Sequence, residues 1–167
     1  DFTVNGLLYD PLTDEVVDHV GGREDLARRR IRAIGDPRER FREDKLRLLR
    51  AVRFAANLGF EIDGPTLAAV KKEAQAVTQV SAERIRDELV KMLTGPDPRR
   101  ALELLKETRL LRQVLPEVER MVGVPQPPEF HPEGDVWTHT LLLLGQLDQA
   151  PETLALAALL HDVGKPP

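Results

Sequence analysis

The sequence predicts a mainly α-helical protein that begins with a short α/β segment. After residue 35, apolar residues recur at helical spacing almost to the end of the chain. Capping residues, glycines and prolines divide this region into lengths that suit short helices. Of the 167 residues, 41% are apolar and only 4% aromatic, so we expect a buried core built mainly from Leu, Val and Ala.

Composition excludes several classes of protein. The chain has no cysteine, which rules out disulfides and thiolate metal sites. No apolar run approaches the roughly 20 residues that a membrane span needs, and no signal segment opens the chain. We therefore expect no membrane partner. Because the chain begins at Asp1 and ends at Pro167 directly after a motif, we also expect it to be part of a longer protein.

The first 34 residues are expected to form the edge of an α/β unit. Short apolar segments at 2–9, 15–20 and 31–34 alternate with turns, including the sequence DPLTD at 10–14. A short helix is expected at 24–29.

A helix is predicted over residues 43–58. Four apolar residues share one face of it: Leu46, Leu49, Val52 and Ala56. Asp44, Arg47 and Arg50 lie off that face and can point into a cleft, and Gly59 is suited to the C-cap.

Further helices are expected along the rest of the chain. The predicted ranges are 65–77, 82–93 after a Ser81 cap, 98 to a break near 108, 136–149 and 151–160. Between them, residues 123–135 contain four prolines and two glycines and cannot be regular helix. This stretch is the predicted domain boundary.

Asp44 and Arg47 together could read the edge of a nucleobase. Cytosine and adenine both show a ring-nitrogen acceptor beside an amino donor, whereas guanine and uracil show a carbonyl beside a ring N–H. A carboxylate that accepts from the amino group and a guanidinium that donates to the ring nitrogen would therefore select C and A. The alternative is that Glu43, Asp44 and Arg47 form ordinary helix-surface ion pairs, worth roughly 0.2 to 0.5 kcal/mol each.

Positive charge is concentrated around this pattern. Residues 23–53 contain twelve Lys and Arg against six Asp and Glu, although the whole chain has a net charge of −4. This basic stretch indicates a site for a polyanion such as a nucleoside triphosphate or an RNA backbone. A solvated helix face is the alternative.

A second polar group lies near the end of the chain. His161 and Asp162 follow an apolar helix, and His139 lies one predicted helix earlier. Imidazole and carboxylate suit a divalent metal that could activate water for phosphoester hydrolysis. A hydrogen-bonded pair at a helix end is the alternative, and three ligands would leave the site incomplete.

Several short segments, spread in a fixed order along nearly the whole chain, together resemble a known protein family. They are residues 1–10 (DFTVNGLLYD), Asp18 with Gly21, Gly22 and Asp25, 31–37 (IRAIGDP), 40–56, Ser81 with Glu83 to Ile85, and 115–117 (LPE). This series resembles the bacterial-type, class II tRNA nucleotidyltransferases and the related bacterial poly(A) polymerases. Residues 130–135, His139 and 161–165 resemble the start of an HD phosphohydrolase domain.

The resemblance implies a domain organisation. Residues 1–34 would be the remainder of a nucleotidyltransferase α/β head, 35–94 a helical nucleotide-recognition neck, and 95–124 a helical body. Residues 125–167 would be a linker and an incomplete, all-α HD domain.

The resemblance also implies an activity and roles for single residues. The intact, cytoplasmic enzyme would add C, C and A to tRNA 3′ ends from CTP and ATP. Asp44 and Arg47 would select the base, with Arg50, Arg53, Asp1 and Asn5 also binding the nucleotide. His139, His161 and Asp162 would be HD metal ligands.

Two departures limit these expectations. Gly6 stands where the family commonly has Ala, and the chain lacks the Gly-Ser loop and Asp-x-Asp pair that bind Mg²⁺ in the family. We therefore expect no catalysis by this piece alone. Addition of only A, only CC or poly(A), an HD phosphohydrolase, and a non-catalytic nucleic-acid-binding module remain alternatives.

Overall fold

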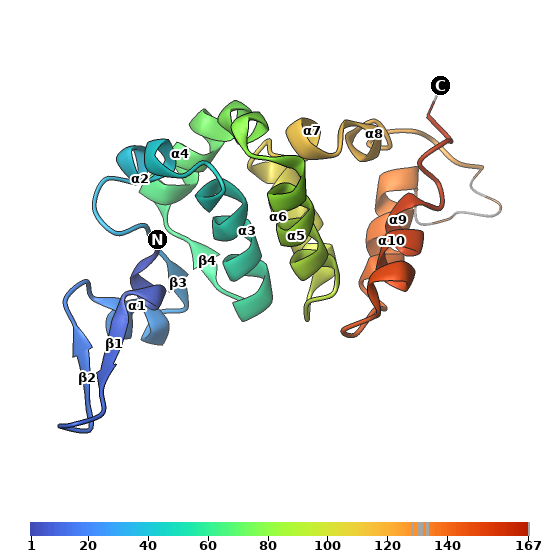
Figure 1. The fold of residues 1–167 in the computed structure, drawn as a ribbon. Coiled ribbons are helices and arrows are strands. Elements are labelled where there is room, and N and C mark those ends of the chain that lie inside the picture. Colours follow the sequence, from blue (N-terminus) through green and yellow to red (C-terminus); the bar gives the residue numbers. More distant parts are fainter. Residues whose placement is uncertain (128, 130–131, 133, 167) are drawn as a thin grey trace.

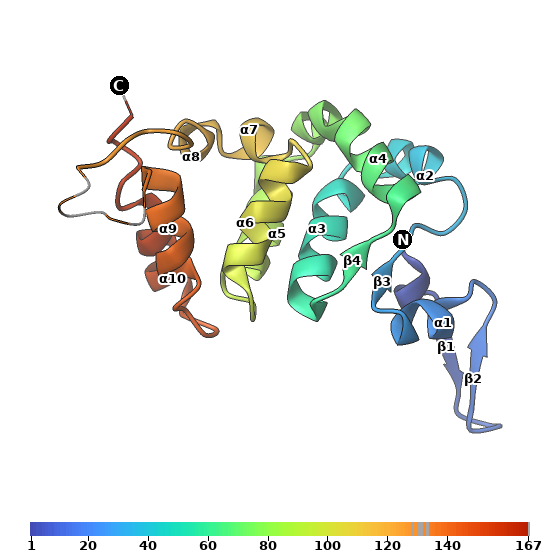
Figure 2. The ribbon, with the colours of Figure 1, turned by 180° about the vertical axis from the view of Figure 1, so that it is seen from behind.

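The computed structural model describes residues 1–127, 129, 132 and 134–166. In this part of the chain ten α-helices and two small sheets follow one another along an elongated body (Figure 1). The α/β segment forms one end and the last two helices form the other, as the reverse view also shows (Figure 2). The prediction of a mainly α-helical chain with an α/β beginning is confirmed.

The N-terminal segment is held together by short strands. β1 (Leu7–Asp10) and β2 (Glu15–Asp18) form an antiparallel hairpin in which Leu8 lies opposite Val17. The 3₁₀ turn η1 (Thr3–Asn5) precedes it, and α1 (Gly22–Ala27) follows. β3 (Arg30–Ile31) pairs in parallel with β4 (Glu61–Ile62), a strand that sequence periodicity did not predict. This pairing attaches the segment to the helices.

The predicted helix 43–58 was wrong at its N-terminal end. α2 (Pro37–Glu43) ends before Asp44, and α3 (Arg47–Leu58) begins three residues later. The backbone of Asp44 is extended, with φ −145° and ψ 108°, and its Oδ1 accepts from the amide of Leu46 at 3.1 Å. Asp side chains commonly bond backbone amides in this way and so favour helix ends over helix interiors.

α3 is the central helix of the core. It packs against α5 (Ala82–Leu93) and α6 (Pro98–Glu107). Its buried residues are Leu48, Leu49, Ala51, Val52, Ala55 and Ala56. Gly59 has φ +64° and is the C-cap, as predicted.

The other caps agree in part with the predictions. Asp97 accepts from the amide of Arg100 at 2.8 Å and begins α6 as expected. Ser81 lies at the N-cap of α5, but its side chain makes no capping bond. The predicted helix 65–77 is α4 (Gly64–Glu73) followed by the 3₁₀ segment η2 (Ala74–Gln79), so its second half was wrong.

The last helices pack on the body. After α7 (Leu111–Val114) and α8 (Pro116–Glu119), α9 (Val136–Leu144) lies against α6, and α10 (Glu152–Leu160) contacts α5 and α9. The predicted helix 136–149 was too long, because α9 ends at the Gly145 cap. A continuous core joins the first residues to the last helices.

The proline-rich stretch connects these helices to the body. Asp135 accepts from the amides of Thr138 at 2.8 Å and Gly123 at 2.6 Å, so it caps α9 and holds the preceding turn. Residues 128, 130, 131, 133 and 167 lie outside the described residues, and 130, 131 and 133 among them carry part of the HD resemblance. The division into domains stays a prediction.

No helix in the described part of the chain has the length and apolar character needed to cross a membrane.

Candidate functional site

Asp44 lies at the turn between α2 and α3 and is oriented by two contacts. Its Oδ1 accepts from Leu46, and its Oδ2 lies 3.2 Å from Nη2 of Arg84, on α5. Both charged side chains are at the surface. Arg84, 40 residues away in sequence, was identified only as part of a motif and not as a partner of Asp44.

Arg47, the first residue of α3, contacts the end of α2. Its Nη1 lies 2.7 Å from Oε2 of Glu43 and 2.8 Å from the carbonyl oxygen of Arg40. The hydrogen bond from Arg47, with a smaller contribution from the charge of Arg40, lowers the pKa of Glu43. The ion-pair interpretation is therefore confirmed for Glu43 and Arg47, whereas Asp44 pairs with Arg84.

Arg50, one turn further along α3, is paired with Asp1. Its Nε lies 3.0 Å from Oδ2 of Asp1, and its Nη2 contacts the same oxygen. The structure thus brings Asp1 and Arg50 together, a contact that the sequence did not predict; their binding of a nucleotide stays a prediction.

Asn5 and Arg53 lie in different surroundings from this pair. Asn5 is exposed at the end of η1. Arg53 points toward α5, where its Nε lies 2.6 Å from Oε2 of Glu88. Its guanidinium carbon lies 4.1 Å from the centre of the Phe54 ring.

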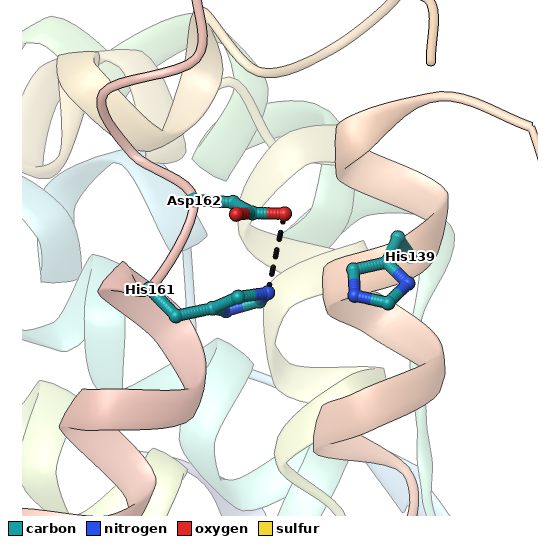
Figure 3. Close-up of side chains that lie close together, drawn as sticks. All are labelled: His139, His161 and Asp162. Atoms are coloured by element: carbon teal, nitrogen blue, oxygen red, sulfur yellow. Dashed lines mark ion pairs between the residues drawn. The ribbon is translucent and has the colours of Figure 1, made fainter. Parts of the chain in front are cut away.

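The second predicted group also comes together. His139 on α9 faces His161 and Asp162, which follow α10 (Figure 3). The two imidazole rings are 5.4 Å apart between centroids, and Nε2 of His161 lies 3.2 Å from Oδ2 of Asp162. One nitrogen or oxygen from each of the three residues lies within 4.8 Å of the others.

The histidine cluster, defined as His139, His161 and Asp162, offers imidazole and carboxylate groups and also contacts a lysine. Nδ1 of His161 lies 2.9 Å from the carbonyl oxygen of Ala158, and Nε2 is the ring nitrogen that faces Asp162. Nζ of Lys165 lies 2.8 Å from Oδ2 of Asp162 and 2.7 Å from Oε1 of Gln126. Burial favours a higher pKa for Asp162, but the Lys165 bond and the charge of His161 bring the pKa below its ordinary value.

Known families match two parts of the chain. Residues 1–32 match the poly A polymerase head domain, and residues 59–121 match the probable RNA and SrmB-binding site of polymerase A.

Curated relatives match almost the whole chain. It is 40% identical over 172 aligned residues to the multifunctional CCA protein of Halorhodospira halophila, an alignment that covers 99% of this chain and 40% of the relative. The multifunctional CCA protein of Neisseria gonorrhoeae shows the same identity and coverage. The chain therefore spans about 40% of the length of these relatives.

Solved structures share its fold. A CCA-adding enzyme of Bacillus stearothermophilus, crystallised in complex with CTP, has a TM-score of 0.67 and 40% identity. That match covers 73% of this chain and 31% of the other. A tRNA nucleotidyltransferase complexed with a primer tRNA and an ATP analogue has a TM-score of 0.65 over 95% of this chain and 51% of its own. At 23% identity, the second match shows the fold alone.

Proposed function

Since the chain belongs to the family of class II tRNA nucleotidyltransferases and related poly(A) polymerases, we propose that it selects CTP and ATP for CCA addition to tRNA 3′ ends. The observation that supports this most is the arrangement of Asp44 and Arg47 on either side of the turn between α2 and α3. The Asp1 and Arg50 pair lies one turn further along α3. A tRNA substrate also implies a cytoplasmic location.

Both base-selecting side chains keep hydrogen-bonding capacity. An ionised carboxylate has about four acceptor sites, and the contacts of Asp44 with Leu46 and Arg84 leave part of them unused. Arg47 uses Nη1 for its contacts with α2, so Nη2 and Nε remain to donate. Arg84 and Glu43 thus orient the two groups, which can then accept from the amino group and donate to the ring nitrogen of cytosine or adenine.

Arg50, Asp1 and Asn5 are proposed to hold the rest of the nucleotide. The guanidinium of Arg50 suits phosphate oxygens because its planar fork can donate two hydrogen bonds at once. Asp1 orients Arg50, and Asn5 is exposed on the same N-terminal segment.

Mg²⁺ in the family is bound by an Asp-x-Asp pair that this sequence does not contain. We therefore propose no step in which residues of this chain bind the catalytic magnesium.

A direct test uses the complete gene product and tRNA that lacks CCA. Arg47→Ala is expected to lower kcat/KM for CTP and ATP by about 100-fold, the size of effect seen when a positioning group is lost. Asp44→Asn replaces an acceptor oxygen with an amide and is expected to relax rejection of UTP and GTP. Arg29→Ala, at an exposed position outside the site, is the control.

Two outcomes would contradict the proposal. If Arg47→Ala changes kcat/KM for CTP and ATP no more than Arg29→Ala does, Arg47 has no role in base selection. Addition of ATP to generic RNA without dependence on CTP would instead identify a poly(A) polymerase.

The histidine cluster supports a second candidate function, a metal-dependent phosphohydrolase. His139, His161 and Asp162 offer imidazole and carboxylate ligands, which fit a divalent first-row metal. Such a metal, when bound, lowers the pKa of a coordinated water and so supplies a hydroxide nucleophile. Loss of phosphodiesterase activity in His161→Ala, with CTP and ATP addition unchanged, would support this function. Retention of that activity would exclude it for this cluster.

A further inference from the structure

We infer that Lys165 and Gln126 form a phosphoryl-binding subsite beside the histidine cluster. In this subsite both side chains donate to non-bridging oxygens of a phosphate or a phosphate ester. The inference rests on the metal-dependent hydrolase function proposed above for that cluster, and it assigns the groups that hold the anion. Neither residue belongs to the predicted set of metal ligands.

Gln126 is a buried amide with a donor that is not used. The residue is 9% exposed, and its Oε1 lies 2.7 Å from Nζ of Lys165. Because an ammonium group only donates, this contact fixes which end of the amide is the oxygen. The other end, Nε2, is buried and has no hydrogen-bond partner among the described residues. A buried donor without a partner costs free energy, and an oxygen of a ligand would offset that cost by accepting from it.

Lys165 connects this amide to the histidine cluster. Its Nζ lies 2.8 Å from Oδ2 of Asp162, so one ammonium group contacts both Gln126 and a predicted metal ligand. These contacts occupy two of its three donors. The Lys165 side chain is 42% exposed, whereas that of Asp162 is 11% exposed. The third donor of Lys165 can therefore reach a ligand that enters from solvent.

The charges of the cluster favour an anion once a cation is bound. In the structure, the carboxylate of Asp162 neutralises Lys165. When a divalent ion is bound by the cluster, Asp162 directs its charge to that ion, and the ammonium group loses its countercharge. A phosphoryl group that contacts the ion would restore a negative charge beside Lys165, and charge-assisted hydrogen bonds of this kind are strong.

The spacing of the two donors suits one phosphoryl group. Nε2 and Oε1 of Gln126 share one amide carbon, and Oε1 lies 2.7 Å from Nζ of Lys165. Nζ and Nε2 are therefore separated by no more than about 5 Å. Two oxygens of a tetrahedral phosphoryl group, each accepting one hydrogen bond, span such a gap. Lys165 supplies charge and Gln126 supplies a second, fixed donor.

The test measures phosphate binding and metal binding separately in the complete gene product. Calorimetric titration with inorganic phosphate at saturating Mn²⁺ gives the affinity for the anion, and titration with Mn²⁺ alone gives the affinity for the metal. Lys165→Met is expected to weaken phosphate binding at least tenfold, because a charged hydrogen bond is lost. Mn²⁺ binding should become tighter, because the competing cation is removed. Loss of a residue that only supported the fold would weaken both.

Substitutions of Gln126 test the second donor. Gln126→Met keeps the side-chain volume, and we expect it to weaken phosphate binding about fivefold and to change Mn²⁺ affinity by less than about threefold. Gln126→Glu keeps an oxygen for Lys165 but replaces the donor with an acceptor, so it should weaken phosphate binding at least as much. Lys165→Arg retains the cation and should bind phosphate within about threefold of the wild type.

Control variants remove the same groups elsewhere. Lys71→Met on α4 and Gln79→Met on η2 should leave both affinities unchanged. The transferase region of the complete protein can also bind metal and phosphate groups, so binding by His161→Ala is subtracted. Dimethyl phosphate serves as a second probe. A loss with both probes supports a subsite that also takes phosphodiesters, and a loss with inorganic phosphate alone supports one for terminal phosphates.

Three results would overturn the inference. Lys165→Met and Gln126→Met could bind phosphate as tightly as the wild type, Lys165→Met could lose Mn²⁺ binding, or phosphate could bind equally well with and without Mn²⁺. Failure of the hydrolase function gives a different result. If His161→Ala keeps phosphodiesterase activity, the cluster is not the hydrolase site, yet the phosphate titrations of Lys165→Met and Gln126→Met still decide whether the subsite exists.

Discussion

The proposed nucleotide-recognition region, defined as Asp44, Arg47 and Arg50, and the histidine cluster are both polar, but their charges are arranged differently. Asp44, Arg47 and Arg50 each contact a side chain of opposite charge. In the histidine cluster, three groups that can bind a cation face one another, and Lys165 is the cationic side chain paired with Asp162 in the described residues. Ion pairs thus orient the first set of side chains, as the proposed reading of a base requires, whereas the second set offers ligand atoms to a positive ion.

The largest expected effect tests whether the histidine cluster depends on the packing of α9, the helix that carries His139, against the helical body. Trp137 on α9 is 5% exposed, and Nζ of Lys106 lies 5.3 Å from its ring centre. Trp137→Ala is expected to cost about 3 to 5 kcal/mol of unfolding free energy, because it leaves a cavity between α9 and α6. Denaturant unfolding measures this. Leu142→Ala, at an exposed position on α9, is the control. If both variants lose a similarly small unfolding free energy, the histidine cluster does not depend on the packing of α9 against the body.

The next effect concerns the cation that is already paired with the cluster. Lys165→Met removes a positive charge 2.8 Å from Oδ2 of Asp162 and is expected to raise the affinity for Zn²⁺ or Mn²⁺ by about tenfold, or about 1.4 kcal/mol. Titration calorimetry measures this directly. Arg84→Ala, in the other region, should leave metal affinity unchanged. Equal metal binding by the wild type and Lys165→Met would show that Lys165 does not compete with the ion.

The next prediction concerns Arg84, which pairs with Asp44 in the proposed nucleotide-recognition region. Its pair with Asp44 is exposed, so Arg84→Ala should cost less than about 1 kcal/mol of unfolding free energy. Without Arg84 the Asp44 carboxylate is less well oriented, and kcat/KM for CTP and ATP is expected to fall by about tenfold. Steady-state kinetics with each nucleotide check this. Unchanged kinetics would mean that the bond with Leu46 is enough to orient Asp44.

The smallest expected effect appears only at low pH. Backbone amides of Arg23 and Gly22, with those of Val20 and Gly21, lower the pKa of Asp18 to about 2. Because the folded pKa is below the unfolded value, Asp18 stabilises the loop above about pH 4, and this contribution is lost as the pH falls toward 2. Asp18→Asn should flatten this part of the stability curve. NMR titration of Asp18 with a midpoint near 4 would contradict the assignment.

Local features were predictable from the sequence. Glu43 and Arg47 pair as their spacing predicted, but across the turn between α2 and α3 and not along one continuous helix. Asp97 begins α6 because its carboxylate accepts from a backbone amide of the first turn, and Gly59 ends α3 because glycine, which lacks a Cβ, readily adopts φ +64°. The grouping of His139, His161 and Asp162 was also predicted, since two adjacent helices connect them.

Other features depended on contacts that spacing cannot show. The break at Asp44 follows from its bond to Leu46, which competes with helix continuation. The partners of Asp44 and Arg53 come from α5, and Lys165 reaches Gln126 across 39 residues. None of these contacts has a periodic signal in the sequence.

The sequence by itself determined which chemical groups the protein carries, where most helices lie, and which local pairs form, because these depend on residue type and short-range geometry. Only the tertiary structure decided which charges meet. Arg50 and Arg53 lie on successive turns of one helix, yet one contacts Asp1 near the surface and the other a buried Glu88. Their different surroundings follow from the packing of α3 against other segments, since the neighbouring segments decide both the burial and the countercharge of each guanidinium.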